Sequence, residues 1–480
     1  MLGLVNNVGA LNAQHNLNRS SDKLNTSIER LSSGFKVNRG ADGPAALTIS
    51  EKQRAQIAGL RAAIDNSEKA VAVVQTAEGA LNEINSLLVK VRSLAIDSAN
   101  TGVNDEDALA ANQSEIANAL DTINRVANNT QFGEKKLLDG SAGLSGITTD
   151  ADVTFLKASA ETSAGSYAVE VTTEAEAANV NGTADQTAAL AQDETLTVNG
   201  VSITLNTGLT QSQVQDRINE FTGQTGVVAE QDPTTGNTGK TRLRSVEYGT
   251  AASIQVVSNV DEGALGTTSG FGTTQKSDTG VDIAGTIGGF AATGVGAVLS
   301  GTEGLSKGTK ISVGENSADK ARTVGGTGDT SQGQVTISNN SLIFQIGASQ
   351  GQTVSVAIDS VEATGLGIGV TGNQFTSLND IDVTSASKSQ DALGVIDAAI
   401  DEVSNLRGTL GAFQANTLES TANNMRTTLE NTVNAESVIR DTDFAEEISN
   451  FTNSQVLVQA GTSVLSSANQ SSQLILSLLG

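Results

Sequence analysis

The sequence contains no cysteine, which excludes disulfide bonds, thiolate nucleophiles and zinc sites with sulfur ligands. It also has no tryptophan and a single histidine, His15. One imidazole cannot form a histidine cluster within a chain, and histidine is the side chain that most often acts as a general base. We therefore expect no catalytic residues, no metal site and no cofactor, and we expect that the protein is not an enzyme.

Positive charge is also scarce, with 28 Lys and Arg against 53 Asp and Glu and a formal net charge of −25. Such an excess of negative charge repels nucleic-acid phosphates and anionic lipid headgroups. No apolar run reaches the length of about 18 residues that a membrane-spanning helix needs. The first basic residue is Arg19, so the start of the chain lacks the positive region of a cleavable signal peptide. We expect no nucleic-acid partner, no membrane partner and no export by such a peptide.

Proline is nearly absent, which leaves room for long helices. Between Pro44 and Asn100 there is no further proline, and apolar residues recur at steps of three, four and seven. At 1.5 Å per residue, such a helix could reach roughly 85 Å. Further helices are predicted over 105–129 and 387–432, and the three indicate an antiparallel bundle. The acidic residues at 105–107 are expected to cap a helix, where its dipole favours negative charge, and not to bind metal.

Both ends of the chain carry narrow apolar stripes at steps of three and four, which favour a coiled coil between the two ends. The stripes consist of Leu17, Ser21, Leu24, Ile28, Leu31 and Phe35 at one end and of Phe444, Ile448, Phe451, Val458 and Leu465 at the other. Further apolar residues would stay uncovered after this pairing, namely Leu4, Val8, Leu11, Ile475 and Leu479. Uncovered apolar patches usually mark association, whereas the alternative is a pair of frayed, partly disordered tails.

The middle of the chain has a different composition, rich in Gly, Thr, Ser and Val, from about Ser141 to Asn340. The segment TLTVNGVSITL predicts two strands joined by an Asn-Gly turn, and SQVQDRINEF after it predicts a short helix. The residues Gly239, Lys240 and Thr241 resemble the end of a phosphate-binding loop. No helical pattern follows them, so we interpret this segment as a surface turn. The predicted class is α+β: a long antiparallel helical bundle or coiled-coil rod built from both termini, with a β-rich insert of two subdomains.

Long segments at both ends resemble bacterial flagellin. They include LNRSSDKLNTSIERLSSGFKVNRGADGPAALTISEKQRAQIAGL near the start and QDALGVIDAAIDEVSNLRGTLGAFQANTLE near the end. In the insert, LTVNGVSITL and DRINEFTGQTGVVA resemble a small module of flagellin and filament-cap inserts, near 195–260. The resemblance implies a structural subunit that polymerises into the flagellar filament for motility, outside the cell, after type III export.

The same resemblance implies partners, domains and contact residues. The partners are other copies of the chain in a helical homopolymer, an export chaperone, the filament cap and the hook-junction proteins. The apolar terminal residues named above become the subunit interface. Residues 1–43 with 436–480 become the inner coiled-coil domain, 44–145 with 342–435 the helical rod with a β-hairpin, and 146–341 the variable surface insert.

Some flagellins are sensed by a Toll-like receptor, which recognises a motif on the helical rod. The motif is typically Gln-Arg-x-Arg-Glu-Leu, with a Glu further downstream. The matching residues that keep this character are Lys90, Arg92, Leu94 and Glu115. Val89 and Ser93 depart from the motif, so the resemblance implies a weakened receptor contact. Two alternatives stay open: a hook–filament junction protein, and a surface adhesin that acts through the β-rich insert.

Overall fold

The computed structural model describes residues 8–100, 102–159, 161–234, 236–237, 239–262, 266–314 and 331–479. The chain divides into two compact units. The first consists of Met1–Lys69, Gln345–Thr353 and Leu418–Gly480, and the second of Ala70–Phe344 and Val354–Thr417. Leu4 lies outside the described residues, and so do the side chains of Ile475 and Leu479.

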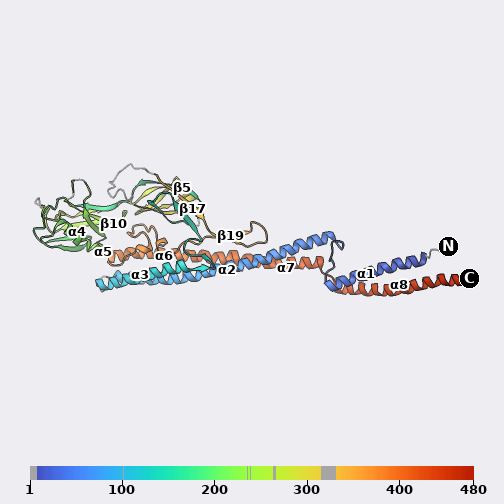
Figure 1. Ribbon diagram of the computed structural model, residues 1–480. Coiled ribbons are helices and arrows are strands. Elements are labelled where there is room, and N and C mark those ends of the chain that lie inside the picture. The colour runs from blue at the N-terminus through green and yellow to red at the C-terminus, as the bar shows by residue number, and fades with distance from the viewer. Residues whose placement is uncertain are drawn as a thin grey trace. The chain divides into compact units, whose positions relative to one another are not determined.

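The first unit is mainly helical. Helices α1 (Val8–Ser33) and α8 (Phe444–Leu479) lie side by side and run antiparallel (Figure 1). The first part of α2 (Pro44–Ser98) packs against α7 (Ser420–Arg440) around a small apolar core of Leu60, Ala63, Ile64 and Met425. Proline at the first helical position suits the start of α2, because its missing N–H has no partner there in any helix. The predicted start at Pro44 and the predicted pairing of the chain's ends are confirmed.

The second unit contains a helical part made of the rest of α2, of α3 (Glu106–Asn129) and of α6 (Ala386–Ala412). Its core is lined by fully buried aliphatic side chains, among them Leu81, Ile84, Leu88, Ile116, Ile123, Val395 and Val403. Asp105 caps α3 by accepting a hydrogen bond of 2.9 Å from the backbone N–H of Ala108, which confirms the expected capping role. The single helix predicted over 387–432 is interrupted, because a π-helical segment, η4 (Phe413–Glu419), joins α6 to α7.

Four short strands form two-stranded pairs. Strand β1 (Gln131–Phe132) pairs with β2 (Lys135–Lys136), and β18 (Leu342–Gln345) pairs with β19 (Thr353–Val356). Short 3-10 turns follow at η2 (Ala363–Gly365) and η3 (Leu378–Asp380). The predicted β-rich middle of the chain begins after β2.

One part of this middle region is an eight-stranded antiparallel sheet in the order β3-β17-β5-β13-β14-β15-β16-β4. Its strands are β3 (Leu144–Thr148), β4 (Val153–Lys157), β5 (Gly165–Thr173), β13 (Ala284–Ile287), β14 (Phe290–Val295), β15 (Val298–Gly301), β16 (Lys310–Val313) and β17 (Ser331–Asn339). A 3-10 turn, η1 (Gly304–Ser306), precedes β16. The buried core of the eight-stranded sheet includes Tyr167, Val169, Ile287 and Ile311.

The other part has a separate core, with Leu196, Ile203, Ile218, Leu243 and Phe271 among its buried side chains. It has two sheets, in the orders β6-β10-β9 and β12-β11-β7-β8. The elements are β6 (Ala177–Asn181), β7 (Glu194–Val198), β8 (Val201–Leu205), α4 (Gln211–Asn219), α5 (Thr222–Thr225), β9 (Val227–Gln231), β10 (Thr241–Tyr248), β11 (Ser253–Ser258) and β12 (Lys276–Thr279).

Local sequence signals in this region are confirmed. Asn199 and Gly200 join β7 to β8 with φ values of 46° and 83°, the left-handed pair that a tight hairpin turn needs. The predicted short helix is α4. Thr241 begins a strand, so the phosphate-loop-like segment leads into no helix. The predicted α+β class, with terminal helices and a central β-rich insert, is confirmed.

Candidate functional site at the paired terminal helices

Helices α1 and α8 meet along a seam that alternates steps of four and three residues, as in a coiled coil. On α1 the covered positions are Ala13, Leu17, Ser20, Leu24, Ser27 and Leu31. On α8 they are Glu447, Phe451, Ser454, Val458, Gly461, Leu465 and Ala468. Leu17 packs on Gly461, since a Cβ placed at position 461 would lie 3.2 Å from the Leu17 Cδ1. Small residues in the seam let the two backbones approach closely.

One end of the seam is closed by a buried carboxylate. Ser27 Oγ donates a hydrogen bond of 2.5 Å to Glu447 Oε1, and Arg30 Nη1 lies 3.5 Å from Glu447 Oε2. Glu447 is buried, and a buried charge is tolerated only where such partners compensate its lost hydration. These contacts fix the register of the two helices at this end.

Two connectors lie next to the seam, residues 34–43 between α1 and α2 and residues 441–443 between α7 and α8. Backbone hydrogen bonds hold these connectors together. Lys36 N–H donates to the Arg440 carbonyl at 2.7 Å, and Thr442 N–H donates to the Gly34 carbonyl at 3.0 Å. The Arg440 guanidinium lies over the Phe35 ring, 4.4 Å from its centroid. Phe35 was predicted to continue the apolar stripe of α1. It lies instead beyond the end of α1, in a β-bridge with Asp441.

Several predicted seam residues point outward. The sequence pattern stepped from Leu24 to Ile28, whereas the seam steps to Ser27; Ile28 is therefore exposed. On α8 the seam begins at Glu447, which leaves Phe444 and Ile448 exposed as well. The physical reason is that the register passes through serine, glycine and glutamate, which a search for apolar residues alone does not find.

The outer faces of the two helices carry large apolar side chains that no residue described by the structure covers. Each of the following is between 48% and 64% exposed: Val8, Leu11, Ile28, Phe444, Ile448, Val456, Leu457 and Val464. Val8 and Leu11 were predicted to stay uncovered. Val456, Leu457 and Val464 were missed, although they continue the apolar content of α8. The remaining predicted residues, Leu17, Leu24, Leu31, Phe451, Val458 and Leu465, are half-buried in the seam.

The four residues that match the receptor-recognition motif, Lys90, Arg92, Leu94 and Glu115, lie in the second unit. Lys90 Nζ of α2 is 2.6 Å from Glu115 Oε1 of α3. Arg92 Nε donates to Asp397 Oδ1 of α6 at 2.6 Å, and this hydrogen bond raises the pKa of the guanidinium. Leu94 is half-buried, and Val89 beside them is exposed. Lys90 and Arg92 therefore tie α2 to the neighbouring helices.

Within the part of the chain that the structure describes, no three His, Cys, Asp or Glu residues are grouped so that they could hold a metal ion. The described helices include none that is long and apolar enough to cross a membrane. His15 is exposed on α1.

The main features of this site are the paired terminal helices and the exposed apolar side chains on their outer faces. The model of the bacterial flagellin N-terminal helical region matches residues 5–143, and that of the C-terminal helical region matches residues 393–479. A flagellin of Salmonella typhimurium is 32% identical, with 98% of each chain covered. The B-type flagellin of Pseudomonas aeruginosa is 31% identical, again with 98% of each chain covered. Flagellin A of Vibrio anguillarum is 32% identical at the same coverage.

The chain belongs to the bacterial flagellin family. It is a structural protein of the flagellar filament, outside the cell, and not an enzyme.

Proposed function

We propose that this chain polymerises into the filament through the outer faces of its paired terminal helices. The observation that carries the proposal is the exposed apolar surface on α1 and α8, which stays uncovered although the two helices already pair. Burying one large aliphatic or aromatic side chain stabilises an association by about 1.5–3 kcal/mol. Several such residues on each copy add to the free energy of association, because they are covered when copies meet.

The contact would be heterologous, with different faces of the helix pair meeting in neighbouring copies. A heterologous contact whose rotation does not close a ring generates an open helical assembly. In this arrangement, residues 1–43 with 436–480 form the inner coiled-coil domain. Residues 44–145 with 342–435 form the outer helical domain, and 146–341 form the solvent-facing insert.

The proposed subunit interface is made of the predicted terminal residues, in two roles. The seam residues Leu17, Leu24, Leu31, Phe451, Val458 and Leu465 align the helix pair within each copy. The outer residues contact neighbouring copies. Among them we place the predicted residues Val8, Leu11, Ile28, Phe444 and Ile448, together with Leu4, Ile475 and Leu479 of the chain ends. To these we add Val456, Leu457 and Val464, which are exposed on the outer face of α8. Phe35 holds the connectors in place.

Other partners follow from the family and are part of the same proposal. An export chaperone would cover the apolar chain ends before type III export. The filament cap and the hook-junction proteins would meet the same helical ends in the assembled flagellum. A receptor contact at Lys90, Arg92, Leu94 and Glu115 would be weak, because Val89 and Ser93 depart from the motif.

Seeded polymerisation tests the proposal. The purified full chain, mixed with short filament seeds, is expected to give long helical filaments in electron microscopy. A variant that begins at Pro44 and a variant that ends at Arg440 each lack one terminal helix and are expected to stay monomeric. Filaments from either truncated variant would contradict the proposal. Persistent monomers of the full chain would favour a hook–filament junction protein.

A further inference from the structure

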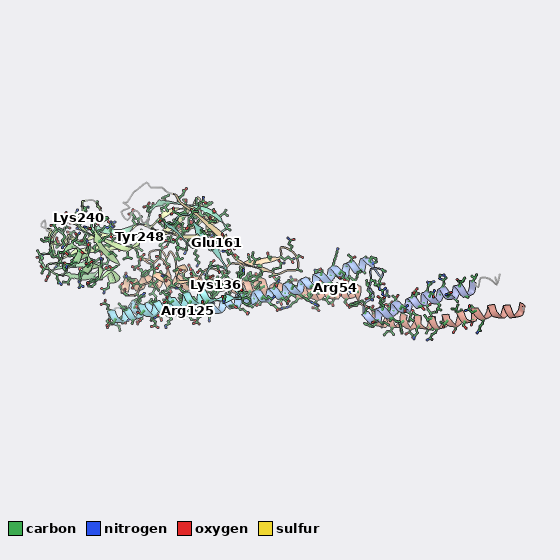
Figure 2. The ribbon with its side chains drawn as sticks, in the orientation of Figure 1. Arg54, Arg125, Lys136, Glu161, Lys240 and Tyr248 are labelled. Carbon is green, nitrogen blue, oxygen red and sulfur yellow. The ribbon has the colours of Figure 1, made fainter. Side chains whose placement is uncertain are left out.

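A half-buried glutamate, Glu247, lies where the β-rich insert meets the helical part of the second unit. It is next to Tyr248 at the end of β10, a position that Figure 2 labels on the β-rich part of the chain. Glu247 also lines a cavity of about 370 Å³. Its carboxylate forms no hydrogen bond or ion pair with any residue that the structure describes. A carboxylate that is partly removed from water without a partner is costly when it is charged.

The part of the insert that contains α4, α5 and β10 meets the helical part through a small set of polar contacts. The eight-stranded sheet has contacts of its own with the helical part, such as Lys157 Nζ to Glu402 Oε2 at 2.9 Å. Lys388 Nζ of α6 donates to the Gly223 carbonyl in α5 and to Asp382 Oδ2, the latter at 2.7 Å. Thr384 Oγ1 donates to the same Gly223 carbonyl at 3.3 Å. Gln224 Nε2 donates to Glu106 Oε1 of α3 at 3.1 Å. A contact built from a few hydrogen bonds is sensitive to one additional unfavourable charge.

The charges around Glu247 come from both sides of the contact. Asp380 of η3 and Lys388 of α6 act on it from the helical part. From the insert, the charged residues around the same cavity are Glu174, Glu176, Arg242 and Arg244. Arg242 is paired with Glu230 at 2.5 Å, and Lys388 is paired with Asp382. The nearby cations are thus committed to other carboxylates, and Asp380 repels a charged Glu247.

We propose that this contact is a proton-operated latch, in which a neutral Glu247 keeps the part of the insert with α4, α5 and β10 docked on the helical part and a charged Glu247 releases that part. The direction follows from the electrostatics. Burial, and then the charge of Asp380, raises the pKa of docked Glu247 from 4.5 to about 7. Once released into water, the carboxyl returns to its ordinary pKa.

The sign of the pH dependence is fixed by this difference. The raised pKa means that the docked state binds the proton more tightly, so the stabilisation is complete below pH 4.5 and is lost as the pH rises to about 7. Between pH 5.5 and 7.5 the docking equilibrium changes by at most about twentyfold. Above that range it is constant.

The absence of cysteine makes a specific distance measurement possible. Ser212→Cys in α4 and Ala111→Cys in α3 place one label on each side of the contact, at exposed helical positions. Energy transfer between the labels is followed in the monomeric full chain from pH 5.5 to 8.5, above the pI of about 4.3. The fraction of docked molecules is expected to fall as the pH rises, with its midpoint below about pH 7.

Two variants separate the latch from general effects of pH. Glu247→Gln keeps a neutral side chain of the same shape and is expected to stay docked, without pH dependence. Glu303→Gln removes an exposed carboxylate elsewhere in the insert and is expected to titrate like the unmodified chain. A pH-independent distance in the unmodified chain would overturn the proposal, and so would an unchanged titration in Glu247→Gln. An ordinary pKa for Glu247 in carbon-13 NMR of the carboxyl groups would also overturn it.

Discussion

Leu17 of α1 lies directly over Gly461 of α8, so closely that no side chain fits at position 461 without displacing it. A Cβ there would be 3.2 Å from the Leu17 Cδ1 and 3.6 Å from the Leu17 Cβ. This contact lies within the seam and sets how closely the two terminal helices approach.

Replacing that glycine is expected to loosen the helix pair. Gly461→Val forces a branched side chain against Leu17, and overpacking of this kind costs about 1–3 kcal/mol. Amide hydrogen exchange in α1 and α8 of the monomer should become faster. Gly411→Val is the matched control, because Gly411 is also helical and has open space around its Cβ position. Equal exchange rates for the Gly461→Val variant and the unmodified chain would contradict the close packing.

The buried carboxylate gives a second prediction. Ser27→Ala removes the hydrogen bond to Glu447 and leaves a buried charge with one partner fewer, which costs about 1–3 kcal/mol. The loss is expected to appear as faster amide exchange in the last turns of α1 and the first turns of α8. Ser32→Ala, on the exposed side of α1, should change nothing. If the two alanine variants exchange alike, Ser27 does not support the seam.

The receptor contact gives a third prediction. The double substitution Val89→Gln and Ser93→Glu introduces the two residue types that the receptor-recognition motif of other flagellins has at these positions. Each regained hydrogen bond to a charged group is worth about 1.5–3 kcal/mol, so potency in a receptor reporter assay is expected to rise at least tenfold. Val103→Gln serves as the control, since it changes another exposed valine that lies outside the motif. Full potency of the unmodified chain would show that the departures at 89 and 93 do not matter.

The sequence predicted best those features that depend on a few neighbouring residues, such as helix starts, helix caps and tight turns. Proline at position 44, the acidic cap at 105 and the Asn199–Gly200 turn each depend on the backbone of a few neighbouring residues, and each lies where it was predicted. The π-helical segment Phe413–Glu419 was not predicted, because its sequence carries the same helical propensities as its neighbours.

The candidate site was predicted only in part for a related reason. The pairing of the two chain ends followed from their apolar stripes, but the register did not. Ser27 and Gly461 occupy seam positions because a partner helix is present, and neither residue type signals burial by itself. Arg440 was missed because its partner, Phe35, is distant in sequence and the contact needs both connectors in place. Long-range pairings of this kind are visible only in the folded chain.

In the proposed filament, the outer faces of α1 and α8, and not only the seam between them, drive assembly. Val456→Asp places a charge on the outer face of α8 and leaves the seam intact. Phe451→Asp and Leu31→Asp place a charge inside the seam. All three variants are expected to remain soluble monomers and to fail to polymerise. In the monomer, only the two seam variants should show faster amide hydrogen exchange in α1 and α8. Ile147→Asp changes an exposed apolar residue in the insert, 74% exposed against 57% for Val456, and should polymerise normally.

Electron microscopy of the Val456→Asp variant after addition of filament seeds tests this claim most directly. We expect long filaments from the unmodified chain and from Ile147→Asp. From Val456→Asp we expect unassembled monomers in which the amides of α1 and α8 stay protected from exchange. Normal filaments from Val456→Asp would show that this outer face is not a subunit contact.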